Sequence, residues 1–466
     1  MTTPTQDHPT PARNVGEALA QPVSIQSLAV FRIVFGALLA WDVWRFVEHD
    51  RIWRYYVQPE FFFTYPGFGW IAPLGEPYLH IAWFLVGIFA VLVMLGLFYR
   101  VAIVGFTVLF SYFFLLDKAQ YLNHFYMVIL FAVLLCFLPA HRAFSLDARL
   151  WPRLRCETVP YASVFVLRAQ IEIILIFAGI VKITPDWLAG EPLGLWLREQ
   201  ADVVPFGALF QHDWLIQAGA WATILLHILG APLLLWRRTR LPVFLIYCCF
   251  HVSNAYFFNI GIFPWLTIGA TLIFFPPDWP QRFARWLLGR FEALPPRPAF
   301  ALPAAGRLSP VALAAIALWL AVQVALPLRF AAYPSEVRWA GDGHRFAWRM
   351  RMYDREADGV FVVTDPASGT TWEVDPLDYL TERQAWTMLP RADMVRQFAG
   401  HLEDVWRRRG YADVAVTARI EKSLNGRDFQ PFIDPAVDLT TVEVNPSGPD
   451  PWVLPLTTPL RTAAAR

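Results

Sequence analysis

The sequence predicts a mostly α-helical, polytopic membrane protein of about nine transmembrane helices, followed by a small C-terminal α+β domain outside the membrane. Of its 466 residues, 56% are hydrophobic and only 17% are charged, and the mean hydropathy of +0.39 is too high for an ordinary soluble protein. Apolar runs of membrane-spanning length recur up to about residue 330 and then stop. The net charge of +1 gives no reason to expect a nucleic-acid partner.

The first 25 residues are predicted to be a disordered cytoplasmic tail. They are polar, contain several Pro and Thr, and lack both a basic n-region and a small-residue cleavage site, so they do not resemble a cleaved signal. The four cysteines lie in or beside apolar segments, without the spacing of a disulfide framework or a zinc site. No metal is therefore expected.

Residues 26–330 are predicted to form the transmembrane catalytic domain. The apolar runs cover 27–47, 80–99, 101–116, 122–139, 164–183, 214–236, 241–258, 261–275 and 311–328. Only Arg100 separates the second and third runs, which predicts a tight helical hairpin. Several runs are short and contain polar residues, as expected where helices line a buried site.

The distribution of arginine predicts the orientation of these helices. Loops on the side of the N-terminus carry arginine clusters at 149–155, 237–240 and 282–307, whereas the opposite loops carry few basic residues. Basic loops stay in the cytoplasm. The sequence thus predicts a multi-pass protein of the cell inner membrane, with a cytoplasmic N-terminus and an extracytoplasmic C-terminal domain.

Residues 331–466 are predicted to form this small α+β domain, ending in a flexible C-terminal tail. The segments 361–364, 372–374 and 414–420 have the composition of strands, and Asn425-Gly426 is a strong hairpin-turn signal. Between the strands, apolar residues recur at three- and four-residue spacing, which predicts an amphipathic helix; they are Met394, Phe398, Leu402 and Val405.

Lys182, at the end of the apolar run 164–183, is the leading candidate for a catalytic base. Only three of the 39 basic residues are lysines, and an amine can lose its proton where a guanidinium cannot. Burial lowers the pKa of a lysine and so favours the neutral form that a base needs. The Asp186-Trp187 pair follows one turn later and could orient the amine. The alternative is a lysine whose charge reaches the membrane interface.

Other polar residues lie within the apolar runs. Arg168 and Glu172 are four residues apart on one face of a helix, so a functional pair and an internal ion pair that locks helix packing both remain open. His124 and His251 lie on different helices, each with an asparagine nearby, which favours a shared polar pocket. Core packing, metal or haem ligation and proton transfer remain open for these histidines, although no HExxH, phosphate-binding or GxSxG motif occurs.

Six stretches carry a family resemblance. In chain order they are DKAQYLNHFY from Asp117, IFAGIVKITPDW from Ile176, FHVSNAYFFNIGIFPW from Phe250, FFPPDWP from Phe274, GHRFAWRM from Gly343 and FIDPAVDL from Phe432. Together they resemble the vitamin K-dependent γ-glutamyl carboxylase family and its bacterial relatives, the horizontally transferred transmembrane (HTTM) domain proteins. The resemblance covers roughly residues 27 to 440.

The resemblance implies a reaction. In this family the lysine matching Lys182 removes a proton from vitamin K hydroquinone, for which menaquinol is a bacterial counterpart. Oxygen then adds, and the resulting alkoxide takes a γ-hydrogen from a glutamate of a protein substrate. Carbon dioxide traps the carbanion to give γ-carboxyglutamate, and the quinone leaves as its 2,3-epoxide. Such a base requires a pocket from which water is excluded, in contact with the lipid bilayer.

The resemblance also suggests site residues. It implies catalytic roles for Lys182, for His124 and for His344, which is expected near the carboxylation centre. It implies binding roles for Asn123, His251, Asn254, Gln170 and Arg32, the last two as pocket-lining residues. The chain lacks the long C-terminal extension and the inter-domain cysteine pair of the animal enzymes, so recognition of a glutamyl substrate is where it departs from the family.

Three alternatives remain open at the level of sequence. The first is a quinol epoxidase that acts on another substrate or on none. The second is a non-catalytic membrane protein that binds or transports a quinone, with Lys182 and the histidines as a proton relay. The third is a haem protein with two histidine ligands.

Overall fold

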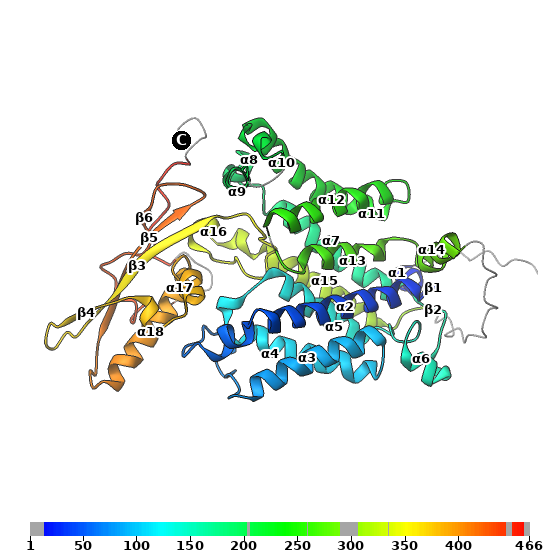
Figure 1. The fold of residues 1–466 in the computed structure, drawn as a ribbon, viewed down its shortest axis with the longest axis horizontal. Coiled ribbons are helices and arrows are strands. Elements are labelled where there is room, and N and C mark those ends of the chain that lie inside the picture. Colours follow the sequence, from blue (N-terminus) through cyan, green and yellow to red (C-terminus); the bar gives the residue numbers. More distant parts are fainter. Residues whose placement is uncertain are drawn as a thin grey trace, which may run out of the picture.

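In the computed structural model, the described residues form nine apolar helices that lie side by side, and a sheet domain covers one end of the bundle (Figure 1). The structure describes residues 14–202, 206–258, 260–288, 306–333, 335–443 and 450–460. Within them, seven helices are long and apolar enough to cross a membrane, and two apolar helices are shorter. The predicted fold class, a polytopic membrane protein with a small extramembrane domain, is confirmed.

The apolar helices follow the predicted runs closely. The long ones are α2 (Gln26–Glu48), α3 (Tyr78–Leu95), α4 (Tyr99–Leu116), α7 (Ala162–Ile180), α10 and α11 (Asp213–Leu225 and Ala231–Leu235, joined by the π-helical turn Leu226–Gly230), α12 (Arg240–Phe258) and α15 (Pro310–Leu328). The shorter ones are α5 (Asn123–Phe137) and α13 (Phe263–Thr271), which a 3₁₀ turn extends to Phe274. Short connecting helices are α1 (Val15–Ala20), α6 (Leu146–Leu150), α8 (Pro185–Leu188), α9 (Leu193–Glu199), α14 (Trp279–Leu288) and α16 (Val337–Ala340).

In the group α2 to α5, each helix packs against the next one in the chain, largely through aromatic side chains. At Gly36 an added Cβ would lie 2.5 Å from the backbone nitrogen of Met94, so glycine lets α2 approach α3 directly. The predicted hairpin between α3 and α4 exists, but it turns at Gly96, whose φ of 63° suits glycine. Arg100 lies inside the first turn of α4 and does not form the turn.

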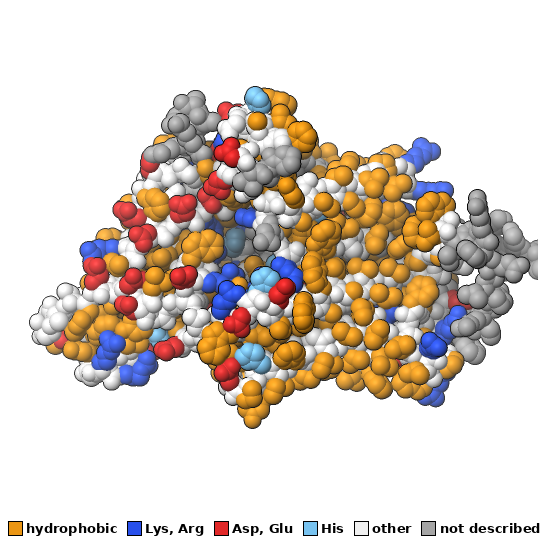
Figure 2. All heavy atoms as spheres, in the orientation of Figure 1, with side chains coloured by type: hydrophobic (Ala, Val, Ile, Leu, Met, Phe, Trp, Pro, Cys, Tyr) orange, Lys and Arg blue, Asp and Glu red, His pale blue; other side chains and the backbone are white. Residues whose placement is uncertain are grey.

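The outer surface of the helices is apolar, as a lipid-facing surface must be. Figure 2 shows an almost continuous hydrophobic belt, with charged side chains concentrated over the sheet domain and at the opposite end. Large side chains such as Trp44, Phe84, Val101 and Leu318 lie exposed in this belt. Since exposed apolar patches of this extent do not occur on soluble monomers, the belt marks the part of the protein that contacts the bilayer.

The prediction of a disordered tail over residues 1–25 is wrong from Asn14 onwards; residues 1–13 lie outside the described chain. The side chain of Asn14 caps α1 by accepting from the backbone N–H of Glu17. Strand β1 (Pro22–Ser24) then pairs antiparallel with β2 (Thr158–Pro160). These few residues gain order because they bury Leu19 and Ala20 and hydrogen-bond to a distant loop.

The C-terminal domain is built on an antiparallel sheet with strand order β4-β3-β5-β6. The strands are β3 (Arg355–Thr364), β4 (Thr371–Val374), β5 (Ala415–Leu424) and β6 (Gln430–Pro431), and the helices are α17 (Glu382–Met388) and α18 (Ala392–Arg408). The apolar face of α18 packs on the sheet through Met394, Phe398 and Leu402, which are fully buried. The predicted α+β arrangement, including the turn at Asn425 and Gly426, is confirmed.

Residues 450–460 belong to the ordered domain. The predicted flexible C-terminal tail is therefore left to residues 461–466, which lie outside the described chain. Trp452 is buried in the core of the domain, and Val453 forms a β-bridge with Ile433. The amide oxygen of Gln430 accepts hydrogen bonds from Thr457 and Thr458. The segment is ordered because it completes the hydrogen bonding of the edge strand β6.

The sheet domain is joined to the membrane helices by a partly buried ion cluster. Asp393 at the start of α18 accepts from Lys118 Nζ at 2.6 Å and from Arg345 Nη1 at 2.9 Å. Lys118 belongs to the loop between α4 and α5, and its side chain is almost fully buried. The cluster therefore fixes the domain to that loop.

This cluster predicts acid-sensitive domain docking. Burial alone would raise the pKa of Asp393, but the charges of Arg345 and Lys118 outweigh it and hold the pKa well below the usual value. A carboxylate with a depressed folded-state pKa contributes stability above its unfolded pKa of about 4 and loses that contribution as the pH falls further. We expect the thermal midpoint, followed by tryptophan fluorescence, to fall between pH 5 and pH 3 by less in Asp393→Asn than in the wild type. Equal falls would contradict this role.

Candidate functional site

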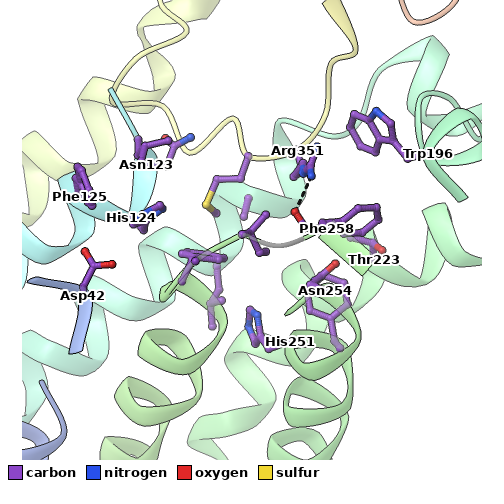
Figure 3. Close-up of a pocket in the computed structure, with 18 of the residues that line it drawn as sticks. Asp42, Asn123, His124, Phe125, Trp196, Thr223, His251, Asn254, Phe258 and Arg351 are labelled. Atoms are coloured by element: carbon purple, nitrogen blue, oxygen red, sulfur yellow. Dashed lines mark hydrogen bonds between the residues drawn. The ribbon is translucent and has the colours of Figure 1, made fainter. Parts of the chain in front are cut away.

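A cavity of about 510 Å³ lies where the membrane helices meet the sheet domain. Its walls come from the start of α5, the end of α7, the π-helical turn between α10 and α11, the end of α12, the start of α13 and the segment that carries Met350 and Arg351. Figure 3 shows His124 on one side of it and His251 with Asn254 on another, with Arg351 and Trp196 above them. Aromatic rings make up much of the remaining wall, including Phe46, Tyr55, Phe125 and Phe263.

Lys182 reaches this cavity because α7 ends at Ile180 and the chain turns immediately after it. The side chain is only 5% exposed, and Nζ donates to the carbonyl oxygens of Ala178 at 3.0 Å and Met350 at 3.1 Å. The ring of Trp187 lies 5.2 Å from Nζ. Among the described residues, no carboxylate forms an ion pair with it. Burial lowers the pKa of Lys182 to about 7.

The number of hydrogen bonds suits a neutral amine. A neutral lysine has two N–H groups and one lone pair, whereas the ammonium form has three N–H groups and no lone pair. Two carbonyl oxygens satisfy the two N–H groups of the neutral form and leave the lone pair free. The arrangement at Lys182 can therefore accept a proton.

Asp186 does not orient this amine, so that prediction is wrong. Its carboxylate accepts from Arg427 through both oxygens, at 2.7 and 2.8 Å, and from Asn425 at 2.8 Å, and it pairs with Arg338 at 2.7 Å. Burial would raise the pKa of Asp186, but these hydrogen bonds and charges lower it. Two arginines compete for the carboxylate more strongly than a neutral amine could. Asp186 thus attaches the loop that follows Lys182 to the sheet domain.

The two predicted histidines do share the cavity. The ring centroid of Phe263 lies 6.4 Å from that of His124 and 5.9 Å from that of His251, so both histidines lie beside the same aromatic side chain. His251 is almost fully buried, and neither of its ring nitrogens has a hydrogen-bond partner in the described structure. A buried polar group without a partner is costly. A bound molecule with a hydroxyl or carbonyl group would satisfy it.

Asn123 and Asn254 also line the cavity. The amide of Asn123 donates to the carbonyl of Arg349 at 3.2 Å, and its oxygen accepts from the hydroxyl of Tyr121 at 3.0 Å. The N-terminus of α5 is thereby fixed to the segment that enters the sheet domain. Asn123 accordingly holds the wall in place next to His124.

That segment, residues 341–353, has an unusual backbone. Phe346, Trp348 and Arg351 all have positive φ, at 61°, 57° and 44°, a region that disfavours side chains other than glycine. The ring of Trp348 is fully buried and stacks on Tyr126 at 5.1 Å. Packing of this kind can maintain a strained backbone, and such strain concentrates at functional sites.

Three predicted site residues do not line the cavity. His344 faces Tyr353 at 5.8 Å, and burial lowers its pKa well below the usual value. Arg32 is fully buried but donates to the carbonyls of Val93 and Met94, at the end of α3, and of Phe144, in the loop between α5 and α6. Gln170 bonds to Gln323 and Trp319 and attaches α15 to α7. The predicted pocket-lining positions of Arg32 and Gln170 are wrong, because the side chain of each forms its hydrogen bonds with other helices or loops and not with groups of the cavity.

Arg168 and Glu172 do not form the internal ion pair that was one of the two interpretations of their spacing. Arg168 donates to the carbonyls of Ile273, Phe274 and Phe275, which end the 3₁₀ turn after α13. The orphan carbonyls at a helix end offer a guanidinium several acceptors at once. Among the described residues, one buried carboxylate oxygen of Glu172 has no hydrogen-bond partner.

Sequence reasoning missed the positive charge of the cavity wall. Four arginines line it, Arg45, Arg51, Arg351 and Arg383, against the single carboxylate of Asp42. They come from α2, the loop after it, the segment before β3 and α17, so no sequence window contains them all. Sequence reasoning also missed His227. The one feature that could have indicated it was the presence of a histidine inside the apolar run 214–236.

Two family models match the chain, one after the other. The model described as HTTM domain matches residues 20–279, more than half of the chain. The model described as vitamin K-dependent gamma-carboxylase, lumenal domain, matches residues 308–459. The chain belongs to the vitamin K-dependent γ-carboxylase family. In this member of the family, the first match covers most of the helices around the cavity, and the second covers the last helix and the sheet domain. No solved structure matches the chain.

Proposed function

We propose that this γ-carboxylase family member couples the oxygenation of a reduced naphthoquinone to its 2,3-epoxide with the carboxylation of glutamate in a protein substrate. The observation that carries the proposal is the buried Lys182, with two carbonyl oxygens for its two N–H groups, facing an aromatic cavity at the membrane. Vitamin K hydroquinone or menaquinol, oxygen and carbon dioxide are the proposed co-substrates. The proposed location is the cell inner membrane, with the N-terminus in the cytoplasm and the sheet domain outside it.

Lys182 is the proposed general base that takes a hydroxyl proton of the quinol. The ring of the quinol fits among Phe46, Phe125 and Phe263, since aromatic walls favour a flat apolar ring. His251 would bond a quinol oxygen through its unpartnered ring nitrogens, and His124 would act from the opposite wall. Lys182, His251 and Phe125 are buried, which limits the access of bulk water to a strongly basic intermediate.

The charge of the cavity favours a carboxylate-bearing substrate. Arg45 pairs with Asp42 at 3.6 Å, whereas Arg51, Arg351 and Arg383 form no ion pair with a described carboxylate. Figure 2 shows basic side chains around a hollow between the apolar belt and the sheet domain. Guanidinium groups without a counter-charge attract carboxylates strongly. They are the proposed binding groups for a glutamyl segment.

The test is turnover by detergent-purified protein supplied with vitamin K hydroquinone, oxygen, bicarbonate and a Glu-containing peptide. Epoxide together with a peptide that gains the mass of one carbon dioxide is the expected result. The matched peptide with Gln in place of Glu should gain no mass. Epoxide without any mass gain would leave a quinol epoxidase, and the absence of oxygen uptake would overturn the proposal.

The arginines of the cavity give a further prediction. Arg351→Gln and Arg383→Gln should each raise the KM for the acidic peptide by about tenfold, because each removes a hydrogen-bonding charge. The KM for the hydroquinone should change little. The control is Arg407→Gln, which alters an exposed arginine of α18 that pairs only with neighbours on its own helix. An unchanged peptide KM in both cavity variants would exclude this binding role.

A further inference from the structure

His227 is a third histidine of the cavity and, like His251, it is buried. The family's motifs assign it no role. It lies in the π-helical turn Leu226–Gly230, and its side chain is only 4% exposed. Isolated π turns within α-helices occur frequently at functional sites, because the extra residue changes the direction of side chains. This turn directs His227 to the same cavity as Lys182.

One hydrogen bond determines the tautomer of the neutral imidazole, that is, which of its two nitrogens carries the proton. Nδ1 of His227 lies 2.7 Å from the carbonyl oxygen of Thr223. A carbonyl oxygen can only accept, so in the neutral imidazole Nδ1 carries the proton and Nε2 is a free acceptor. The rings of Tyr247 and Phe250, at 5.9 and 5.2 Å, hold the imidazole from α12.

Close helix packing brings His227 next to Lys182. At Gly179 an added Cβ would lie 2.9 Å from Cβ of His227, so only glycine allows this approach. The side chain of Lys182 turns back along α7, because Nζ bonds to the carbonyl oxygen of Ala178, the residue before Gly179. The amine of Lys182 and Cβ of His227 therefore both lie beside the turn of α7 that contains Ala178 and Gly179.

Protonation of Lys182 creates one N–H group that the carbonyls of Ala178 and Met350 do not serve. No oxygen of the described residues accepts it. We propose that Nε2 of His227 accepts this third N–H, directly or through one water molecule, and so stabilises the charged form of Lys182 inside the cavity. This inference rests on the proposed role of Lys182 as a base. The proton taken from the quinol stays on Nζ, and His227 stabilises the resulting ammonium group without a carboxylate.

The other titratable groups around His227 are few. Lys182 faces it from the end of α7, and Tyr247 and His251 face it from α12. The described parts of α10 and α11, which flank its own turn, bring no further titratable group against it. Protonation or deprotonation of Lys182 is therefore the main change in charge close to His227.

The test is a pH titration of Lys182 followed by NMR of protein labelled with [¹³Cε]lysine in detergent micelles. The chain has only three lysines, so the spectrum contains three side-chain signals, and Lys118 and Lys422 report on the fold. His227→Asn keeps an amide N–H for the Thr223 carbonyl but lacks Nε2. We expect its Lys182 midpoint to fall by about one pH unit from the wild-type value, a tenfold loss of the charged form. His227→Gln, whose amide oxygen reaches further, should restore most of it.

His212→Leu is the matched control, since His212 is an exposed histidine at the start of α10, and its Lys182 midpoint should equal that of the wild type. If His227→Asn does not fold, His227→Ser lacks Nε2 equally and takes its place. An unchanged Lys182 midpoint in either folded variant would overturn the inference. The titration uses no quinol, so it can fail while epoxidation still depends on Lys182, and it can succeed even if the protein makes no epoxide.

Discussion

Lys182→Ala is expected to reduce epoxide formation from vitamin K hydroquinone by at least about a hundredfold, the usual contribution of a general base. The variant loses the one amine that combines burial, two carbonyl partners and contact with the cavity. In the wild type the rate should rise with pH through about 7, because the neutral amine is the active form and predominates above the pKa of Lys182. Quantification of the epoxide by chromatography measures both effects.

Two further variants make this result specific. Lys182→Arg should be as inactive as Lys182→Ala, since a guanidinium does not release its proton. Lys118→Arg keeps a cation beside Asp393 and should retain most of the activity. Added ethylamine should partly rescue Lys182→Ala, because the substitution leaves room for a small amine beside the Ala178 and Met350 carbonyls. Epoxidation by Lys182→Ala at the wild-type rate would refute the assignment.

Asp186→Ala is expected to cause the largest loss of stability, about 3–5 kcal/mol, because it leaves two arginines partly or fully buried without their counter-charge. Arg427 and Arg338 both bind this carboxylate. The measurement is thermal unfolding in detergent at pH 7. Since the pKa of Asp186 is lowered in the folded protein, its contribution is fully present above the usual pKa of an aspartate and is lost below it, so the difference between variant and wild type should shrink in acid.

The control for Asp186→Ala is Asp213→Ala. Asp213 also pairs with an arginine, Arg198, at 2.6 Å, but its side chain is 66% exposed. Exposed ion pairs contribute at most about 1 kcal/mol. A similar small effect in both variants would show that Asp186 does not hold the Lys182 loop to the sheet domain.

The sequence predicted those parts of the fold that depend on local pattern. Hydropathy located the nine apolar helices of the described chain, and alternation located β3 and β5, because both signals follow directly from which side chains face lipid or core. It did not reveal the order of residues 14–25, where three strand residues gain stability only from pairing with β2. Pairing partners far along the chain leave no local signal.

The candidate site was only partly predictable for the same reason. The rarity of lysine pointed to Lys182, but all three lysines are buried, and Lys422 is equally enclosed, with carbonyl partners at Trp339 and Pro390. What distinguishes Lys182 is the cavity, which is a property of the tertiary structure. Polarity within an apolar run likewise suggested Arg32 and Gln170, although both hydrogen-bond to neighbouring helices. His227 was missed because a π turn has no pattern in the sequence.

The bond from Lys182 to the carbonyl of Met350 spans 168 residues of chain. During synthesis, all the membrane helices up to α15 are complete before Met350 leaves the ribosome. Until then the amine lacks one of its two acceptors and the cavity lacks one wall. During synthesis, Lys182 therefore lacks its second carbonyl partner while the membrane helices assemble. The site is complete only when the last third of the protein folds onto the helices.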